Sequence, residues 1–195
     1  MRARSDIDVA VVVESGLGDG AVEQLVAGLD HASLPCPARR LELVVYRLGV
    51  ARSGGVGPDF ELNLNTGAAM DTLVERRGAT AEPHWYVVDR SILAQAGEAL
   101  RGPGAPSVFA SAPHSDVVAA VATSIAWFMS ADAPAADAIL NACRGLRYAR
   151  EGRWTSKDAA GEWYLSYVGT SDAVRAARRA RGACPGREGD AEPPP

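Results

Sequence analysis

The stretch Arg4-Ser5-Asp6-Ile7-Asp8-Val9-Ala10-Val11-Val12-Val13 places two carboxylates at the start of an apolar, β-branched run. We predict a buried strand over residues 7–13, because such runs are typical of strands covered on both faces. Side chains alternate along a strand, so Asp6 and Asp8 would share one face about 6–7 Å apart. Neighbouring carboxylates repel, and the most economical partner is Mg²⁺ bridged to the phosphates of a nucleotide. An Asp-rich turn before a buried strand is the alternative.

The composition argues against several classes of function. The 195 residues carry 20 Lys and Arg against 24 Asp and Glu, a formal net charge of -4. Nucleic-acid binding is disfavoured because phosphate contacts require a basic face. We find no signal-peptide pattern and no apolar run near about 18 residues, and we expect a cytoplasmic protein without membrane insertion. Three widely spaced cysteines without histidines at ligand spacing indicate neither a disulfide framework nor a zinc site.

The pattern after residue 13 is first α/β and then helical. We predict a helix over 21–31, strands over 41–46 and 60–65, and a glycine-rich loop over 49–58. Further helices are predicted over 85–100, 115–129, 135–150, from 155 onward and over 172–181. The fold class is therefore α+β. Residues 1–80 form an α/β domain, 81–181 an all-α helical bundle, and 182–195 a disordered tail.

A third acid, Glu42, lies inside the predicted strand 41–46. If this strand lies beside the first, Glu42 approaches Asp6 and Asp8. Three such acids suit nucleotidyl transfer, because two hold metal on the phosphates and the third takes the proton of the attacking hydroxyl. The alternative is an edge-strand acid that faces water.

Lys157 is the only lysine of the chain, and it follows the hydroxyl residues Thr155 and Ser156 at a predicted helix start. A helix N-terminus presents unpaired N–H groups to anions, and a compact ammonium adds a full charge. This combination favours binding of a triphosphate. A solvated lysine in an ordinary helix cap is the alternative.

Together these segments resemble the nucleotidyltransferase-fold aminoglycoside adenylyltransferases that modify streptomycin and spectinomycin. Ser5-Asp6-Ile7-Asp8 is similar to the Ser-Asp-Ile-Asp metal motif of that family, and Arg39-Arg40-Leu41-Glu42 to the segment that carries its catalytic base. Residues 84–103 resemble the first helix of its C-terminal helical domain. Residues 152–158 look like the segment whose basic residues meet the ATP phosphates, and Arg144 looks like a further arginine of the family.

The resemblance implies a Mg²⁺-dependent enzyme that moves AMP from ATP to a hydroxyl of an aminoglycoside or aminocyclitol. It implies Asp6 and Asp8 as metal ligands and Glu42 as the base. The residues implied at ATP are Ser5, Arg144 and Lys157. Those implied at the acceptor are Trp127, Asp132 and Asp137. For Trp127 the alternative is a core position, because aromatic residues in apolar helices are most often buried. The partners would be these small molecules, and we expect a monomer.

The chain also departs from that family. Its members carry a Gly-Ser turn upstream of the Asp pair, on a strand and helix that precede it, and this turn grips the triphosphate. Only four residues precede Ser5 here. We therefore expect a truncated, incomplete nucleotidyltransferase-type domain, with apolar surface uncovered along 9–13 and 43–45 and with weak or absent catalysis.

Two other functions stay open. The first is an inactive, nucleotide-binding remnant of the family. The second is an antitoxin-like minimal nucleotidyltransferase. The fused helical region disfavours the second, because it lacks an Arg-x-x-x-x-His ribonuclease motif.

Overall fold

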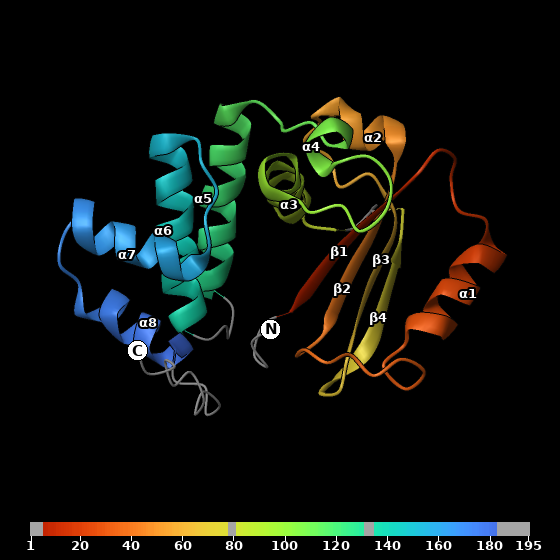
Figure 1. Ribbon diagram of the computed structural model, residues 1–195, viewed down its shortest axis with the longest axis horizontal. Coiled ribbons are helices and arrows are strands. Elements are labelled where there is room, and N and C mark those ends of the chain that lie inside the picture. The colour runs from red at the N-terminus through yellow and green to blue at the C-terminus, as the bar shows by residue number, and fades with distance from the viewer. Residues whose placement is uncertain (1–5, 78–80, 131–134, 183–195) are drawn as a thin grey trace, which may run out of the picture.

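A computed structural model describes residues 6–77, 81–130 and 135–182. Within these ranges a four-stranded sheet and eight helices confirm the predicted α+β class. The strands are β1 (Ile7–Val13), β2 (Leu41–Arg47), β3 (Phe60–Gly67) and β4 (Met70–Arg76). The helices are α1 (Asp19–Leu29), α2 (Leu48–Ser53), α3 (Pro83–Ala96), α4 (Ala105–Val108), α5 (His114–Ser130), α6 (Ala135–Glu151), α7 (Lys157–Tyr167) and α8 (Asp172–Gly182). Figure 1 shows the sheet beside the helical half, with β1 as the strand nearest to α5.

The sheet has the strand order β1-β2-β3-β4. The first two strands are parallel, and the remaining neighbours are antiparallel. Parallel neighbours require a crossover connection, and α1 provides it. This topology places the first residues of β1 and β2 at the same end of the sheet, so the acids near those strand starts come together.

Helix α1 covers one face of the sheet. Its Val22 packs with Leu43, Val45, Leu62 and Leu64, and all five side chains are buried. The predicted exposure of residues 43–45 is therefore wrong for Leu43 and Val45, because α1 lies over them. The prediction is right for Val11 of β1, whose exposed fraction is 38%.

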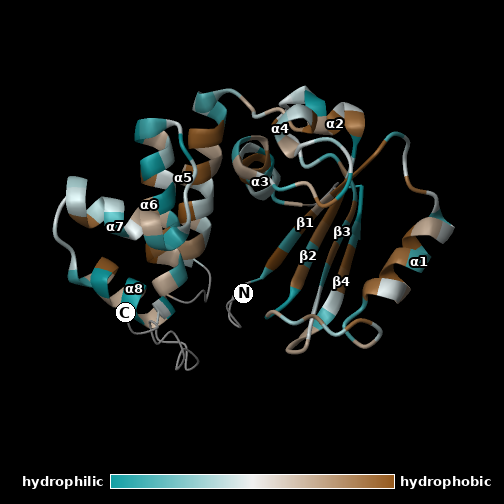
Figure 2. Ribbon diagram, viewed as in Figure 1, coloured by the Kyte–Doolittle hydropathy of each residue, from teal (hydrophilic) through white to brown (hydrophobic). Residues whose placement is uncertain are grey.

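Helices α3 and α4 cover the opposite face. Tyr46 and Phe60 of the strands pack there against Tyr86 of α3 and Phe109 after α4. Figure 2 shows β1 and β2 changing from hydrophilic at their starts to hydrophobic further along. The apolar parts of these strands lie beneath the helices, and the acidic starts extend beyond this core.

Two elements differ from the prediction. Residues 70–76 form β4, which pairs with β3 in a hairpin; its alternation of polar and apolar residues is too imperfect to reveal a strand. Residues 48–53 form α2 within the predicted loop, and the helix ends at Gly54, which adopts a left-handed φ of 60°. A left-handed residue is a common helix terminator, and glycine adopts that conformation without strain.

The helical half is organised around α6, which packs against α5, α7 and α8. Gly145 of α6 permits close approach, because a Cβ atom there would collide with Val121 of α5. Helices α5 to α8 thus pack together, while α3 and α4 of the predicted bundle also pack on the sheet, and the domain boundary near residue 80 stays a prediction. None of the helices in the described ranges is long and apolar enough to cross a membrane. The predicted tail lies outside the described residues beyond Gly182.

Candidate active site

Asp8 and Glu42 are register partners in the parallel pair β1–β2. Directly opposed side chains of neighbouring strands lie on the same face of a sheet. The residues two positions further on, Ala10 and Val44, contact the core beneath α3 and α4. The structure therefore brings Asp8 and Glu42 together at the edge of this core, where neither side chain is fully buried.

Asp6 precedes β1 and is held by two arginines. Arg39 donates two hydrogen bonds to its carboxylate, each of 2.7 Å. Arg40 contacts Asp6, with Nε 3.4 Å from its Oδ1, and it also pairs with Glu42. Burial opposes ionisation of Asp6, but the two guanidinium groups prevail and lower its pKa. A positive charge thus lies between Asp6 and Glu42.

The environment of Glu42 shifts its pKa strongly. Burial raises the pKa to about 7, and the negative fields of Asp8 and Asp6 add to this effect. Arg40 acts in the opposite direction but does not compensate. A carboxylate with a pKa near neutrality is well suited to accept a proton as a general base.

Asp89 of α3 is an acid that the sequence pattern did not single out. No hydrogen bond or ion pair involves its side chain among the described residues, and solvent reaches it. Although the side chain is exposed, protein atoms crowd the carboxylate and partly desolvate it, and this effect and then the field of Asp8 raise its pKa, against Arg144 and Arg90. Asp89 therefore adds a fourth acid close to the sheet edge. An acid placed within the apolar segment 86–93 was the available signal.

The buried neighbour of Asp89 has a structural role. The Arg90 guanidinium donates to the carbonyl oxygens of Gly55 and Gly57, at 2.6 and 2.8 Å. Burial lowers the pKa of Arg90. These bonds fix α3 to the loop after α2 and so fix the position of Asp89.

Lys157 lies at the first position of α7, as predicted. Ser156 caps this helix by accepting a hydrogen bond from the Ala159 amide, at 3.1 Å. The ammonium donates to Oδ1 of Asp137 at 3.1 Å, and Arg181 of α8 donates to the same oxygen at 2.8 Å. Burial lowers the pKa of Lys157, although Asp137 opposes this shift. Asp137 is thus shared by two cations.

Arg144 of α6 is a cation that lies within the electrostatic fields of Asp89 and Asp8. Burial lowers its pKa, while Asp89 and Asp8 oppose that shift. Asp137 likewise acts on Arg39, which lies on the strand side. Charged groups of α6 therefore lie near enough to interact with charged groups of the sheet half, Arg144 with Asp8 and Asp137 with Arg39.

Trp127 lies near the end of α5 with 40% of its surface exposed. Its ring contacts Trp85 of α3 edge to face, with centroids 5.1 Å apart, and also contacts Phe128. It is thus a partly exposed aromatic residue rather than a fully buried core residue. Two other predicted site residues, Ser5 and Asp132, lie outside the described residues.

The donor set suits a hard cation only in part. Asp6 and Asp8 supply carboxylate oxygens, which Mg²⁺ prefers, and Mg²⁺ is commonly bound by one or two carboxylates plus phosphates. Within residues 6–77, 81–130 and 135–182, no group of three or more His, Cys, Asp or Glu side chains is arranged to hold a metal. The residues therefore fit Mg²⁺ that arrives with a nucleotide rather than a site built from protein alone.

An open hollow of the surface lies elsewhere. It has a volume of about 610 Å³, is open, and lies between α1 and β4, where Val22, Val26 and Val74 contribute to its lining. None of the predicted site residues lines it. We therefore place the candidate site by its charged groups and not by this hollow.

Comparison with known proteins relates the C-terminal part of the chain to the predicted family. Residues 107–192 match the model of the aminoglycoside adenylyltransferase C-terminal domain. No curated protein matches the sequence. The fold is similar to that of the spectinomycin adenyltransferase AAD(9) from Enterococcus faecialis, whose crystal structure contains ATP and spectinomycin. That match has a TM-score of 0.66 and 18% identity, and covers 92% of this chain and 76% of the other.

Proposed function

We propose that this chain, whose C-terminal domain is that of the aminoglycoside adenylyltransferase family, transfers AMP from ATP to a hydroxyl of an aminocyclitol or aminoglycoside such as spectinomycin or streptomycin. The observation that carries the proposal is the pairing of Asp8 with Glu42 in the register of β1 and β2. Asp8 also lies within the field of Arg144, a residue of the segment that matches an adenylyltransferase family.

In the proposed reaction Glu42 is the general base. An acceptor hydroxyl oxygen attacks the α-phosphorus of ATP, the bond from that phosphorus to the oxygen bridging to the β-phosphate breaks, and pyrophosphate leaves. The hydroxyl proton passes to the Glu42 carboxylate. A pKa of about 7 supports this role, because the group is then substantially ionised at neutral pH and still basic.

Asp6 and Asp8 would hold Mg²⁺ carried by the nucleotide. Bound there, the ion would neutralise charge on the phosphates and orient them. Arg39 and Arg40 both pair with the Asp6 carboxylate. At least one of these guanidinium groups therefore has to move away before Asp6 can bind the ion. Once released, it is a further positive charge beside the phosphates.

Lys157 and Arg144 are the proposed partners of the triphosphate, and Ser5 is a proposed third. The ammonium of Lys157 is presented at the start of α7, where amide groups also favour anions. Asp137 keeps Lys157 and Arg181 in place by accepting from both. We expect the phosphates to compete with Asp137 for these cations.

For the acceptor we propose contacts with Trp127, Asp132 and Asp137. The partly exposed ring of Trp127 offers an apolar surface to a sugar or cyclitol ring. Acids attract the ammonium groups that such acceptors carry. A monomeric, cytoplasmic enzyme without a nucleic-acid partner remains our proposal.

A second candidate function is nucleotide binding without transfer. The paired arginines favour it, because Arg39 and Arg40 neutralise Asp6 and Glu42 within the protein itself. Such a protein would bind ATP and leave any acceptor unmodified.

One experiment separates the two functions. The full chain is incubated with Mg²⁺, ATP labelled at its α-phosphate, and a panel of aminocyclitols and aminoglycosides. Label on at least one acceptor supports the enzyme. ATP binding without transfer to any acceptor supports the second candidate and contradicts the first.

A further inference from the structure

The Arg144 guanidinium lies over the face of an aromatic ring. Its Cζ lies 5.7 Å from the centroid of the Trp154 ring. Within the described ranges its guanidinium makes no ion pair and no hydrogen bond that meets ordinary distance criteria; the acids Asp89 and Asp8 act on it only through their fields. Its N–H donors are therefore not committed to a carboxylate of the described part of the chain.

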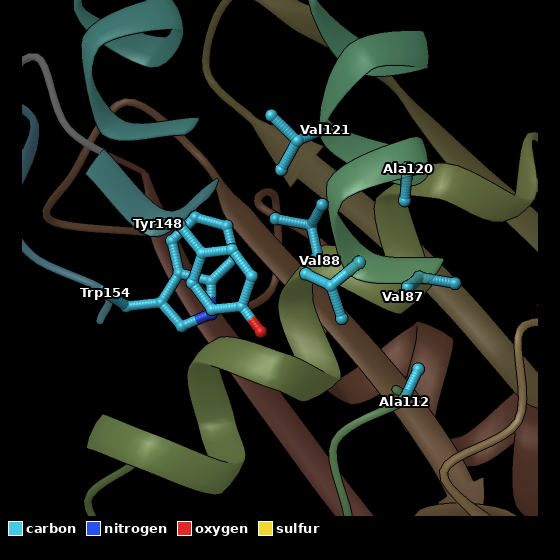
Figure 3. Packing of buried hydrophobic residues seen from close by; sticks show 8 residues of the cluster. Val87, Val88, Ala112, Ala120, Val121, Tyr148 and Trp154 are labelled. Carbon is cyan, nitrogen blue, oxygen red and sulfur yellow. The ribbon is translucent and has the colours of Figure 1, made fainter. Parts of the chain in front are cut away.

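Trp154 itself is tightly fixed. Its ring stacks on Tyr148, with centroids 4.2 Å apart and planes 20° apart, and Figure 3 shows the two rings lying face to face beside Val88. The indole Nε1 donates to Ser91 Oγ at 2.8 Å, and the backbone amide donates to Gln95 Oε1 at 2.9 Å. Both acceptors belong to α3, the helix that also carries Asp89.

We infer that Trp154 is a positioning residue that holds the Arg144 guanidinium for the phosphates of ATP. The inference rests on the proposed function, and it adds Trp154 to the ATP site as a residue that acts through Arg144 without contacting the phosphates. A cation over an aromatic face is attracted by the ring quadrupole, and the attraction strengthens where water is excluded. Trp154 has a relative exposure of 9%, so little water contacts its ring.

A ring positions an arginine differently from a carboxylate. A carboxylate occupies the N–H donors, whereas a ring contacts the guanidinium without consuming them. The donors then stay available for phosphate oxygens. A hollow of only about 20 Å³, lined by Arg144, Trp154 and Asn141 among others, adjoins the pair. The arginine thus has little free space on that side.

The chain offers a matched control in Trp163. This residue of α7 is buried to a similar degree and lies under Arg147 and Arg150, with Cζ atoms 5.8 and 5.9 Å from its centroid. Arg147 is already paired with Glu151. Removing the Trp163 ring costs comparable packing but touches none of the proposed ATP contacts.

The test measures the dissociation constant of Mg·ATP by calorimetry for the unchanged chain and for Trp154→Leu, Trp154→Phe, Trp163→Leu, Arg144→Ala and the double variant Trp154→Leu/Arg144→Ala. We expect Trp154→Leu to weaken binding about fivefold to tenfold, Trp154→Phe less, and Trp163→Leu within about twofold of the unchanged chain. Because Trp154 acts through Arg144, the double variant should bind no more weakly than Arg144→Ala alone.

The possible outcomes are distinct. Equal weakening by Trp154→Leu and Trp163→Leu, or additive losses in the double variant, would overturn the inference and leave the proposed function intact. Absence of Mg·ATP binding by the unchanged chain would overturn both. If thermal unfolding shows that Trp154→Leu does not fold, Trp154→Phe takes its place. Its dissociation constant is then compared with that of Trp163→Leu, and that of the double variant Trp154→Phe/Arg144→Ala with that of Arg144→Ala, by the same criteria.

Discussion

Glu42 lies directly opposite Asp8, and the two residues are Cα partners in the parallel register of β1 and β2. A slip of one residue would turn Glu42 to the face that α1 covers and would turn Leu43 and Val45 away from that helix. The buried apolar side chains of β2 therefore fix the register, and the register places the acid. Packing in the core and chemistry at the strand starts are determined by the same pairing.

Replacing Glu42 by glutamine should abolish proton acceptance with little change of shape. We expect kcat for AMP transfer to fall about 10²- to 10⁴-fold, with the KM for ATP nearly unchanged. Steady-state kinetics on the acceptor found in the panel measure this. The control is Glu75→Gln, on the same sheet face but bonded to Asn63. Equal rates of Glu42→Gln and the control would contradict the role of base.

The raised pKa of Glu42 also predicts how stability depends on pH. The group titrates near 4.5 when unfolded and at about 7 when folded, so the folded protein holds the extra proton between these values. The unfolding free energy contributed by this group therefore falls as pH rises through that interval. At pH 8 we expect Glu42→Gln to be more stable than the unchanged chain, by about 1–2 kcal/mol after allowing for solvent screening.

Urea unfolding at pH 4.5 and pH 8 provides the measurement. The advantage of the glutamine variant should nearly vanish at the lower pH, where Glu42 is protonated in the folded state and half protonated in the unfolded state. A stability difference that is the same at both pH values would show that burial does not raise the pKa of this group.

Lys157→Ala should weaken the interaction with ATP while leaving the acceptor KM unchanged. We expect the KM for ATP to rise about tenfold or more, because a charged hydrogen bond contributes about 1.5–3 kcal/mol. Arg175→Ala is the control, since that arginine pairs on the surface with Asp172 of its own helix. An unchanged KM for ATP in Lys157→Ala would remove Lys157 from the proposed phosphate contacts.

Ser156→Ala tests the cap that positions Lys157. Loss of the bond to the Ala159 amide should cost about 1 kcal/mol of unfolding free energy. Denaturant unfolding measures this, with Ser166→Ala as control, because Ser166 bonds only to a carbonyl within the helix. A cost no larger than that of the control would mean that Ser156 does not stabilise the start of α7.

Much of the candidate site could be predicted from local sequence. The β-branched run after Asp8 predicted a strand, and the structure confirms it as β1, although the expectation of a buried strand was wrong because none of its residues is fully buried. The apolar residues around Glu42 predicted β2. The hydroxyl pair before Lys157 predicted a helix start that the structure confirms at the same residue. These features depend on neighbouring residues alone. The roles assigned to Asp6, Asp8, Glu42 and Lys157 stay predictions.

The remainder depends on contacts between distant segments. Asp89 joins the acids only because Arg90 and the apolar face of α3 fix that helix over the sheet. The pairing of Arg181 with Asp137 spans 44 positions of sequence, and no local pattern indicates it. Strand β4 was missed because its pairing with β3, rather than its own periodicity, makes it a strand.

The most direct test of the account is AMP transfer by Asp8→Asn. The substitution removes one negative charge from the face shared with Glu42, and it leaves the ion pairs of Asp6 with Arg39 and Arg40 in place. Transfer of label from ATP to the acceptor is measured with Mg²⁺ for both proteins. We predict a loss of more than about 100-fold in the variant, with its thermal unfolding unchanged. Full transfer activity in a folded Asp8→Asn protein would contradict the proposed site.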